Sequence, residues 1–251
     1  MKNYKKVLFA AVATLALGTS AVAADKLKVG TEGAYPPFNL IDASGKVIGF
    51  DIDIANALCA EMKVECEIVT SDWDGIIPAL NAKKFDMIVA SMSITPERQQ
   101  AVDFTSPYCT NKLQYIAPKS GDLKTDKANL ECKVIGAQRA TIAGTWLEDN
   151  LGDVVEIKLY DTQENAYLDL NSGRVDGVLA DKFVNWEWLK SDAGKDYEFK
   201  GEPVFDNDKI AIAVRKDDKA LTAKLDAALK AIVDNGTYKQ INDKYFPFSI
   251  Y

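Results

Sequence analysis

Histidine is absent from all 251 residues of the sequence. This excludes catalytic pairs of serine or cysteine with histidine, and it excludes metal sites with histidine ligands. Basic residues are a minority, because 30 lysines and arginines stand against 37 aspartates and glutamates, for a net charge of −7. We expect no nucleic-acid partner, since phosphate binding requires a basic surface. The 47% hydrophobic and 27% charged composition is typical of a globular protein.

Long apolar runs are also absent, apart from one at the N-terminus. Three lysines within residues 1–6 precede the uncharged segment 7–20, and Ala-Val-Ala follows at 21–23. This order is typical of a signal peptide cleaved near Ala23, with an N-terminal membrane anchor as the alternative. The apolar segment is shorter than the roughly 20 residues that cross a bilayer. We therefore expect residues 24–251 to be an exported, soluble protein.

Cysteine is scarce, with four residues: Cys59, Cys66, Cys109 and Cys132. An even number in an exported protein favours disulfides. Cys59 and Cys66 flank a predicted helix end and strand start, so they can close a small loop. Cys109 and Cys132 can form a second bridge, although four cysteines allow three pairings. A metal would need four thiolate ligands here, and we expect none.

Segments with strand and helix patterns alternate along the chain. Residues 26–32 and 65–70 are predicted strands, and residues 51–63 are a predicted helix with apolar side chains at helical spacing. A second helix is predicted at 73–83, before a buried strand at 85–90. This alternation is typical of βαβ units and predicts an α/β fold with parallel sheets.

One eleven-residue pattern occurs twice. The segments 80–90 (LNAKKFDMIVA) and 170–180 (LNSGRVDGVLA) share it at a spacing of 90 residues. Chance, or a common turn between helix and strand, is one explanation. The other is a duplication on the scale of a domain, because this period is too long for a solenoid. The second explanation predicts two similar α/β lobes.

Charged and polar residues follow the predicted strands. Ligands of open α/β sheets bind beyond the carboxyl ends of the strands, so two facing lobes would bring these residues into one crevice. Arg98 suits a carboxylate, and Asp181 suits an ammonium group. Backbone N–H groups near Ser93 and Thr141, each before a predicted helix, suit an anion. Together these groups predict a site for a zwitterion.

Aromatic residues complete the predicted crevice. Tyr35 and Trp73 offer flat faces to the rest of a ligand, with a cation–π contribution where that ligand is charged. Each residue also has a simpler structural role. Arg98 can be a solvated charge or a salt-bridge partner, Asp181 can cap a helix, and the aromatic residues can belong to the core.

Several motifs together resemble the polar amino-acid class (family 3) of bacterial periplasmic solute-binding proteins. The resemblance extends over nearly the whole mature chain, and within the class it is strongest to the lysine/arginine/ornithine-binding and histidine-binding proteins. Those proteins share a cysteine pair that matches Cys59 and Cys66. The motifs are GFDIDI at 49–54 with LC at 58–59, YPPF at 35–38, WDGIIP at 73–78, SMSITPER at 91–98, VDFTSPY at 102–108 and YF at 245–246.

The resemblance implies a type II Venus-flytrap fold, in which two α/β lobes joined by two crossovers close on one amino acid. Residues 24–110 and 208–251 would form the first lobe, and residues 111–207 would form the second with the crossovers. It also implies a periplasmic monomer that binds a free L-amino acid and docks on an inner-membrane ABC permease. No cofactor and no enzymatic activity are expected.

The resemblance also assigns roles to the two ends of an amino acid. Arg98 would hold the α-carboxylate, together with the backbone N–H groups of Ser93 and Thr141. Asp181 would hold the α-ammonium, aided by the Ser93 hydroxyl and the Ser91 carbonyl. Each of these residues matches the family's motif by position.

The distal part of the ligand would meet residues that depart from the family pattern. Tyr35 and Trp73 would sandwich its side chain, and Glu32 lies where basic amino-acid binders carry an aspartate. Ala90 replaces their serine, and Arg139-Ala140 replaces their Gly-Ser. Arg139 can face the cleft, where it would disfavour a cation or favour a second carboxylate, or it can point to solvent. We expect a basic amino acid, with neutral polar amino acids, cystine and opine-like conjugates as alternatives.

Two other classes of function are alternatives. Periplasmic cyclohexadienyl dehydratases share this fold and would need a carboxylic acid with a raised pKa at the leaving hydroxyl. Glu32 is the one obvious candidate, whereas Asp181 and the two aromatic faces favour binding without chemistry. A soluble sensor that reports its ligand to a membrane receptor would use the same closing lobes.

Overall fold

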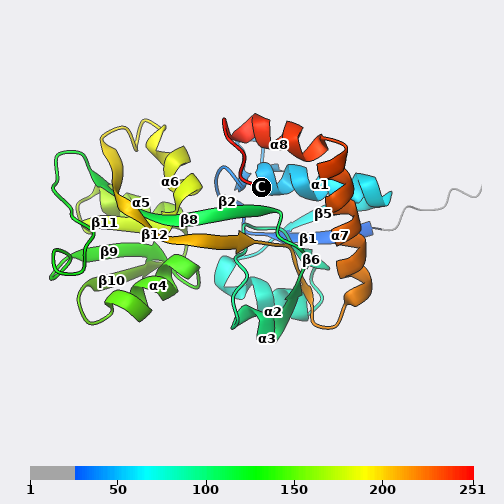
Figure 1. Ribbon diagram of the computed structural model, residues 1–251, viewed down its shortest axis with the longest axis horizontal. Coiled ribbons are helices and arrows are strands. Elements are labelled where there is room, and N and C mark those ends of the chain that lie inside the picture. Colours follow the sequence, from blue (N-terminus) through cyan, green and yellow to red (C-terminus); the bar gives the residue numbers. More distant parts are fainter. Residues whose placement is uncertain (1–25) are drawn as a thin grey trace, which may run out of the picture.

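The computed structural model describes residues 26–251 and contains two α/β lobes that lie side by side (Figure 1). The predicted signal peptide, residues 1–23, and its cleavage near Ala23 lie outside the described residues. Each lobe has a five-stranded sheet with one strand that runs antiparallel to both of its neighbours. The predicted two-lobe α/β fold is confirmed.

The two sheets have the same plan. The first has the order β5-β1-β6-β13-β7, with β1 (Lys26–Thr31), β5 (Glu65–Thr70), β6 (Met87–Ile88), β7 (Val102–Phe104) and β13 (Ala213–Arg215). The second has the order β10-β9-β11-β8-β12, with β8 (Cys109–Pro118), β9 (Val134–Gln138), β10 (Glu156–Tyr160), β11 (Gly177–Asp181) and β12 (Tyr197–Ile210). A small sheet of β2 (Ala34–Tyr35), β3 (Asn39–Ile41) and β4 (Val47–Ile48) belongs to the first lobe.

Helices cover both sheets. The first lobe carries α1 (Phe50–Met62), α2 (Ile76–Asn81), α3 (Arg98–Ala101), α7 (Lys219–Asp234) and α8 (Thr237–Tyr245). The second carries α4 (Ile142–Leu151), α5 (Gln163–Asn171) and α6 (Lys182–Leu189). Their apolar faces are buried: α1 places Ile54 and Leu58, and α7 places Leu225 and Leu229, in one cluster with Val29 of β1. The C-terminal helices thus return to the first lobe.

Two long strands connect the lobes. β8 and β12 pair antiparallel and run between the lobes side by side (Figure 1). Their register places Cys109 opposite Ile210 and Asn111 opposite Asp208. The lobe boundaries predicted at 110/111 and 207/208 fall within these strands, and they stay a prediction.

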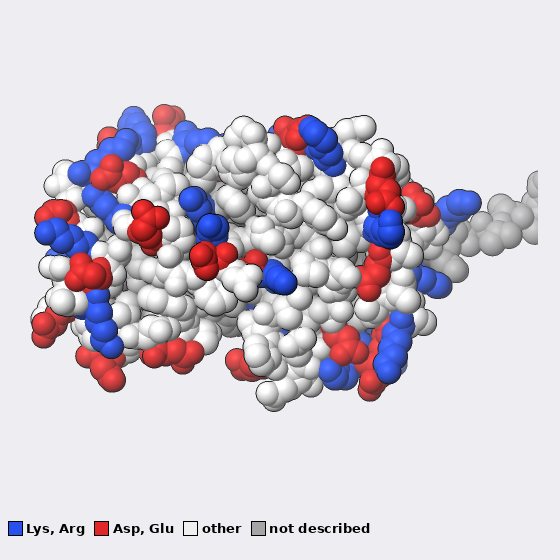
Figure 2. All heavy atoms as spheres, in the orientation of Figure 1, with Lys and Arg blue, Asp and Glu red and all other residues white. Residues whose placement is uncertain are grey.

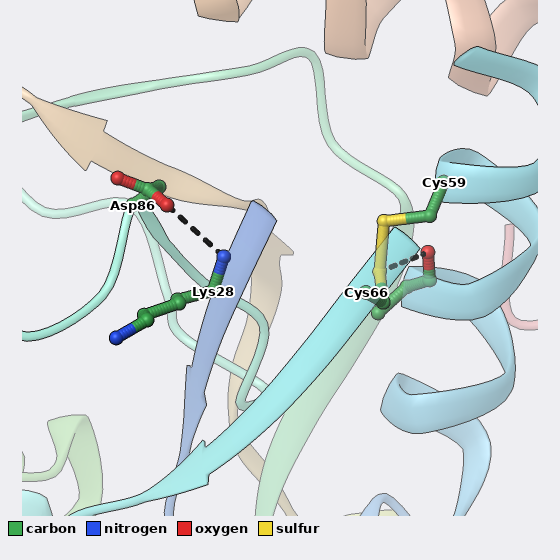
Figure 3. Close-up of a disulfide and its surroundings, with 5 residues drawn as sticks. Lys28, Cys59, Cys66 and Asp86 are labelled. Carbon is green, nitrogen blue, oxygen red and sulfur yellow. Dashed lines mark hydrogen bonds between the residues drawn. A yellow bond between two sulfur atoms is a disulfide. The ribbon is translucent and has the colours of Figure 1, made fainter. Parts of the chain in front are cut away.

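The repeated sequence pattern has the same structural role in both lobes. In the first, the Asp86 carboxylate accepts from the Lys28 N–H at 3.0 Å, and the Asp86 N–H donates to the Lys28 carbonyl at 2.8 Å (Figure 3). In the second, Asp176 makes the same two bonds with Val134, at 2.8 and 2.7 Å. The repeat therefore joins the start of β6 to β1 in the first lobe and the start of β11 to β9 in the second, as a duplication predicts.

The predicted elements near the cleft are correct in type but differ at their ends. The strand predicted at 65–70 is β5, and the helix predicted at 51–63 is α1, which begins one residue earlier. The helix predicted at 73–83 is divided into a 3-10 turn, Trp73–Gly75, and α2. The strand predicted at 85–90 is shortened to β6, because the chain turns toward the cleft at Ser91, where φ is +48°.

The Cys59–Cys66 disulfide joins the end of α1 to the start of β5, with its Cα atoms 5.8 Å apart (Figure 3). The second bridge that the sequence left possible, between Cys109 and Cys132, is not formed: both thiols are free. Cys109 is buried at the start of β8 in the core of the first lobe, whereas Cys132 is exposed in the turn before β9 of the second. Their places in different lobes keep the two thiols apart.

Charges of both signs are interspersed on the surface. Figure 2 shows acidic and basic side chains in alternation over one face of the molecule. A surface of this kind does not attract a polyanion. Within residues 26–251, the helices are too short or too polar to cross a membrane.

Candidate ligand-binding site

A cavity with about 280 Å³ of empty space lies between the lobes. Nine of the ten residues predicted for the site line it, and Arg139 does not. Gln138 and Ile142, which sequence reasoning missed, complete the wall. The lining residues are Glu32, Tyr35, Trp73, Ala90, Ser91, Ser93, Arg98, Gln138, Thr141, Ile142 and Asp181.

The lining residues lie where parallel strands end. Glu32 follows β1, Ser91 lies three residues beyond β6, Thr141 follows β9, and Asp181 is the last residue of β11. The sheets of the two lobes therefore present their carboxyl ends to one cleft, which is the usual ligand site of open α/β sheets. This placement confirms the crevice that the sequence predicted.

One end of the cavity suits a carboxylate. Arg98 donates to the Ser93 carbonyl and to the Ala140 carbonyl, both at 2.9 Å. These two bonds fix the guanidinium and leave three of its five N–H groups for a ligand. Thr141 is the N-cap of α4, and its hydroxyl accepts from the Gly144 N–H at 3.2 Å. The first turn of α4 thus adds backbone N–H groups and a positive helix end to this anion site.

A second part of the cavity wall suits an ammonium group. Asp181 is 4% exposed and lines the cavity. Burial, followed by the nearby charge of Asp208, raises the pKa of Asp181 well above its usual range, although Tyr35 and Asn111 lower it. A cation beside this carboxylate would favour its charged form. Ser91 adds a buried hydroxyl that has no hydrogen-bond partner among residues 26–251.

A third part of the cavity wall is acidic. The Glu32 carboxylate accepts from Gln138 Nε2 at 2.6 Å, a bond between the lobes. Burial raises the pKa of Glu32 to about 7, against the lowering effect of the Gln138 bond, and Asp72 and Asp74 raise it further. Gln138 Oε1 is buried and has no partner among the described residues. Glu32 and Gln138 therefore offer two oxygen acceptors to a hydrogen-bond donor of the ligand.

The aromatic side chains form the walls. Tyr35 is 6% exposed and Trp73 is 8% exposed, and both line the cavity. Trp73 donates from Nε1 to the Ala140 carbonyl at 3.0 Å, so its ring is fixed across the cleft. The Arg98 guanidinium carbon lies 5.2 Å from the centre of that ring. These contacts hold the Trp73 ring, one of the two predicted flat faces, in a fixed position.

The sequence pattern of bacterial extracellular solute-binding proteins, family 3, matches residues 27–248. The chain belongs to this family. It is similar to the L-arginine-binding protein of Pseudomonas aeruginosa, at 44% identity over 98% of each chain. It is also similar to the ABC transporter arginine-binding protein 1 of Escherichia coli K12, at 41% identity over 97% of this chain and 99% of that one.

A solved structure supports the assignment to family 3. An ancestral arginine-binding protein bound to arginine superimposes with a TM-score of 0.85 and is 35% identical. The alignment covers 89% of this chain and 99% of that chain. The predicted resemblance to family 3 of the solute-binding proteins is therefore confirmed over both lobes.

The lobes of this family 3 protein are closed over the cavity. The Ala140 carbonyl of the second lobe accepts from both Trp73 and Arg98 of the first. At the outer rim, Arg139 lies 3.3 Å from Asp74 of the first lobe and also pairs with Asp161 of its own lobe. Of the two orientations left open for Arg139, which was among the candidate site residues, the structure shows the one outside the cavity, because these acids hold its guanidinium at the rim.

The glycine and first aspartate of the family motif GFDID support the site from behind. Asp51 is buried and accepts from the Tyr108 hydroxyl at 2.7 Å and from Asn39 at 2.9 Å. The same Tyr108 oxygen accepts from the Ser91 N–H at 3.2 Å. Gly49, at φ +130°, brings the chain so close that a Cβ would lie 2.3 Å from the Phe38 carbonyl oxygen. The motif therefore positions Ser91 without touching the cavity.

Proposed function

We propose that the protein is the periplasmic binding component of an ABC importer and that it binds one basic L-amino acid, with arginine as the first candidate. The charged groups that line the cavity carry this proposal: a guanidinium at Arg98 and carboxylates at Asp181 and Glu32. The α-carboxylate, the α-ammonium and the distal cation of a basic amino acid need these three partners. The arginine-binding relatives support the choice.

Each part of the ligand would have a partner in this arrangement. Arg98 and the start of α4 would hold the α-carboxylate, and Asp181 the α-ammonium. The aliphatic chain would lie between Tyr35 and Trp73. A guanidinium would donate to Glu32 and to the free Oε1 of Gln138, which explains why that end carries two acceptors.

The proposal includes export and delivery but no chemical step. The N-terminal segment would direct the chain to the periplasm and be cleaved near Ala23. The closed, ligand-bound monomer would dock on an inner-membrane permease. Glu32 has a raised pKa, as a dehydratase would require, but it already accepts a hydrogen bond from Gln138, and in this proposal it binds the distal group of the ligand. We therefore propose binding without catalysis.

A thermal-shift screen tests the ligand class. Refolded, ligand-free protein of residues 24–251 is mixed with arginine, lysine, ornithine, histidine, glutamine, glutamate and prephenate. At 1,000 times its dissociation constant a ligand adds about 4 kcal/mol, a shift on the order of 10 °C in a protein of this size. We expect that shift with basic amino acids, and its loss in Arg98→Ala and Asp181→Asn but not in the remote surface variant Lys230→Ala. Shifts with neutral or acidic compounds alone would overturn the proposal.

A further inference from the structure

Asp208 is a buried carboxylate that amino-acid binding, as proposed above, does not use. It lies on the crossover strand β12, directly opposite Asn111 of β8, and is 2% exposed. It does not line the cavity, unlike its neighbour Asp181. Burial raises the pKa of Asp208, while Asn111, Ser93 and the charge of Arg98 lower it. An acid in such a place needs a function that outweighs the cost of its burial.

The hydrogen bonds of Asp208 connect it to the cavity wall. Its Oδ2 accepts from the Ser93 hydroxyl at 3.1 Å and from Asn111 Nδ2 at 3.2 Å. Asn111 also lowers the pKa of Asp181, so the same amide acts on both acids. Ser93 itself lines the cavity. Asp208 is therefore separated from a ligand by a single side chain.

The bond to Asp208 fixes what Ser93 can do for a ligand. A hydroxyl has one proton to donate and two lone pairs to accept with. Because the proton points to Asp208, only lone pairs face the cavity. The backbone of Ser93 is fixed, because Arg98 donates to its carbonyl at 2.9 Å, Ile94 donates to Lys209 at 2.9 Å and Met92 accepts from Ala211 at 3.0 Å. The hydroxyl oxygen is thus a fixed acceptor beside Asp181.

We propose that Asp208 is a positioning residue that holds the Ser93 hydroxyl as an acceptor for the α-ammonium of the ligand. The inference rests on the proposed function for the identity of that ammonium group. It makes the site selective for a free, protonated α-amine, because a deaminated ligand has no N–H group here and an N-acylated ligand has a single neutral one, which cannot donate to both this acceptor and Asp181. Asp208 thereby adds a second negative charge behind the ammonium site without touching the ligand.

Two ligands separate this role from a structural one. We compare L-arginine with 5-guanidinopentanoic acid, which is arginine without its α-amine, by calorimetric titration. The proteins are the wild type, Asp208→Asn, Ser93→Ala and the double variant. Asp86→Asn is the matched control, because this acid lies in the same lobe, bonds to a backbone N–H and does not line the cavity.

We expect Asp208→Asn to weaken arginine binding at least ten-fold and to change binding of the deaminated acid less than two-fold. Ser93→Ala should show the same selective loss, and the double variant should be no weaker than the weaker single variant. Equal losses for both ligands, or losses that add in the double variant, would show that Asp208 only joins the crossover strands to the first lobe. If Asp208→Asn does not fold, Asp208→Glu takes its place in the same comparison, and an equal loss of both ligands in Ser93→Ala would by itself overturn the proposal.

Failure of the proposed function has a different result. A wild-type protein that binds another amino acid but not arginine would overturn the basic specificity. The same comparison, made with that amino acid and its deaminated acid, would still decide the role of Asp208. A wild-type protein that binds only ligands without an α-amine would overturn both.

Discussion

Glu32 is the residue on which the choice of ligand depends. Its carboxylate is the acidic end of the cavity and meets Gln138 of the opposite lobe. We expect Glu32→Gln to weaken arginine binding by 10- to 100-fold, because a charged hydrogen bond contributes about 1.5–3 kcal/mol. Binding of neutral glutamine should change little. Calorimetric titration of both ligands measures this, with Ala90→Ser as a control that alters the wall but keeps the charge.

Buried acids make the ligand-free protein sensitive to pH. Burial raises the pKa of Glu32 to about 7 and that of Asp51 to about 6. Between about pH 4 and pH 7 the folded state therefore holds more protons than the unfolded state, and the free energy of unfolding falls as the pH rises. We expect a higher melting temperature at pH 5 than at pH 7.5. A melting temperature that rises from pH 5 to pH 7.5 would show that these two carboxyl groups do not have raised pKa values. Glu32→Gln should make the melting temperature depend less on pH.

Most single residues of the site could be predicted from the sequence, because strand ends and family motifs placed them. Gln138 was missed although it is the last residue of β9, because the sequence analysis assigned to the crevice only residues that follow the strands. Asp208 was missed because its partner Ser93 is 115 residues away in the sequence. The two orientations of Arg139 could not be separated, since its position depends on Asp74 and Asp161, which come from different lobes.

At the scale of elements, the sequence predicted the kinds of helices and strands better than their ends. The repeat at 80–90 and 170–180 predicted two equivalent strands, and reciprocal bonds of Asp86 and Asp176 confirm them. The ends of β6 and α2 depend on a turn at Ser91 and on the 3-10 turn at Trp73, which neighbouring segments impose. The Cys109–Cys132 bridge could not be judged from the sequence either, because the spacing of two cysteines does not show in which lobe each of them lies.

The turn before α1 depends on Gly49. A Cβ at this residue would lie 2.3 Å from the Phe38 carbonyl oxygen, and φ is +130°. We expect Gly49→Ala to cost more than about 2 kcal/mol of unfolding free energy, since both the contact and the backbone angle oppose it. Urea unfolding measures the loss. Gly45→Ala is the control: φ is +83° there, with no atom within 4 Å of a Cβ, so a loss near 1 kcal/mol is expected.

At the scale of the whole molecule, contacts outside the cavity hold the lobes together. Arg139 reaches Asp74 across the rim at 3.3 Å, and both side chains are nearly half exposed. Exposed pairs contribute about 0–1 kcal/mol, so we expect Arg139→Ala to weaken arginine binding by up to about five-fold, mainly through faster dissociation. Stopped-flow kinetics measures this. Asp74→Ala should have the same effect, and the double variant should be no weaker than either single variant. Effects that add in the double variant would show that the Arg139–Asp74 pair does not hold the lobes together.

The Ala140 carbonyl accepts from Trp73 and Arg98 across the cleft, and these bonds are made by the protein alone. Because only the closed arrangement of the lobes forms them, they favour closure and lower the conformational cost of binding a ligand. The same bonds must break before the lobes can part. A stronger clamp at Ala140 would therefore raise the affinity and slow the release of the ligand together, so the strength of these two bonds sets a limit on how fast a bound molecule can be handed on.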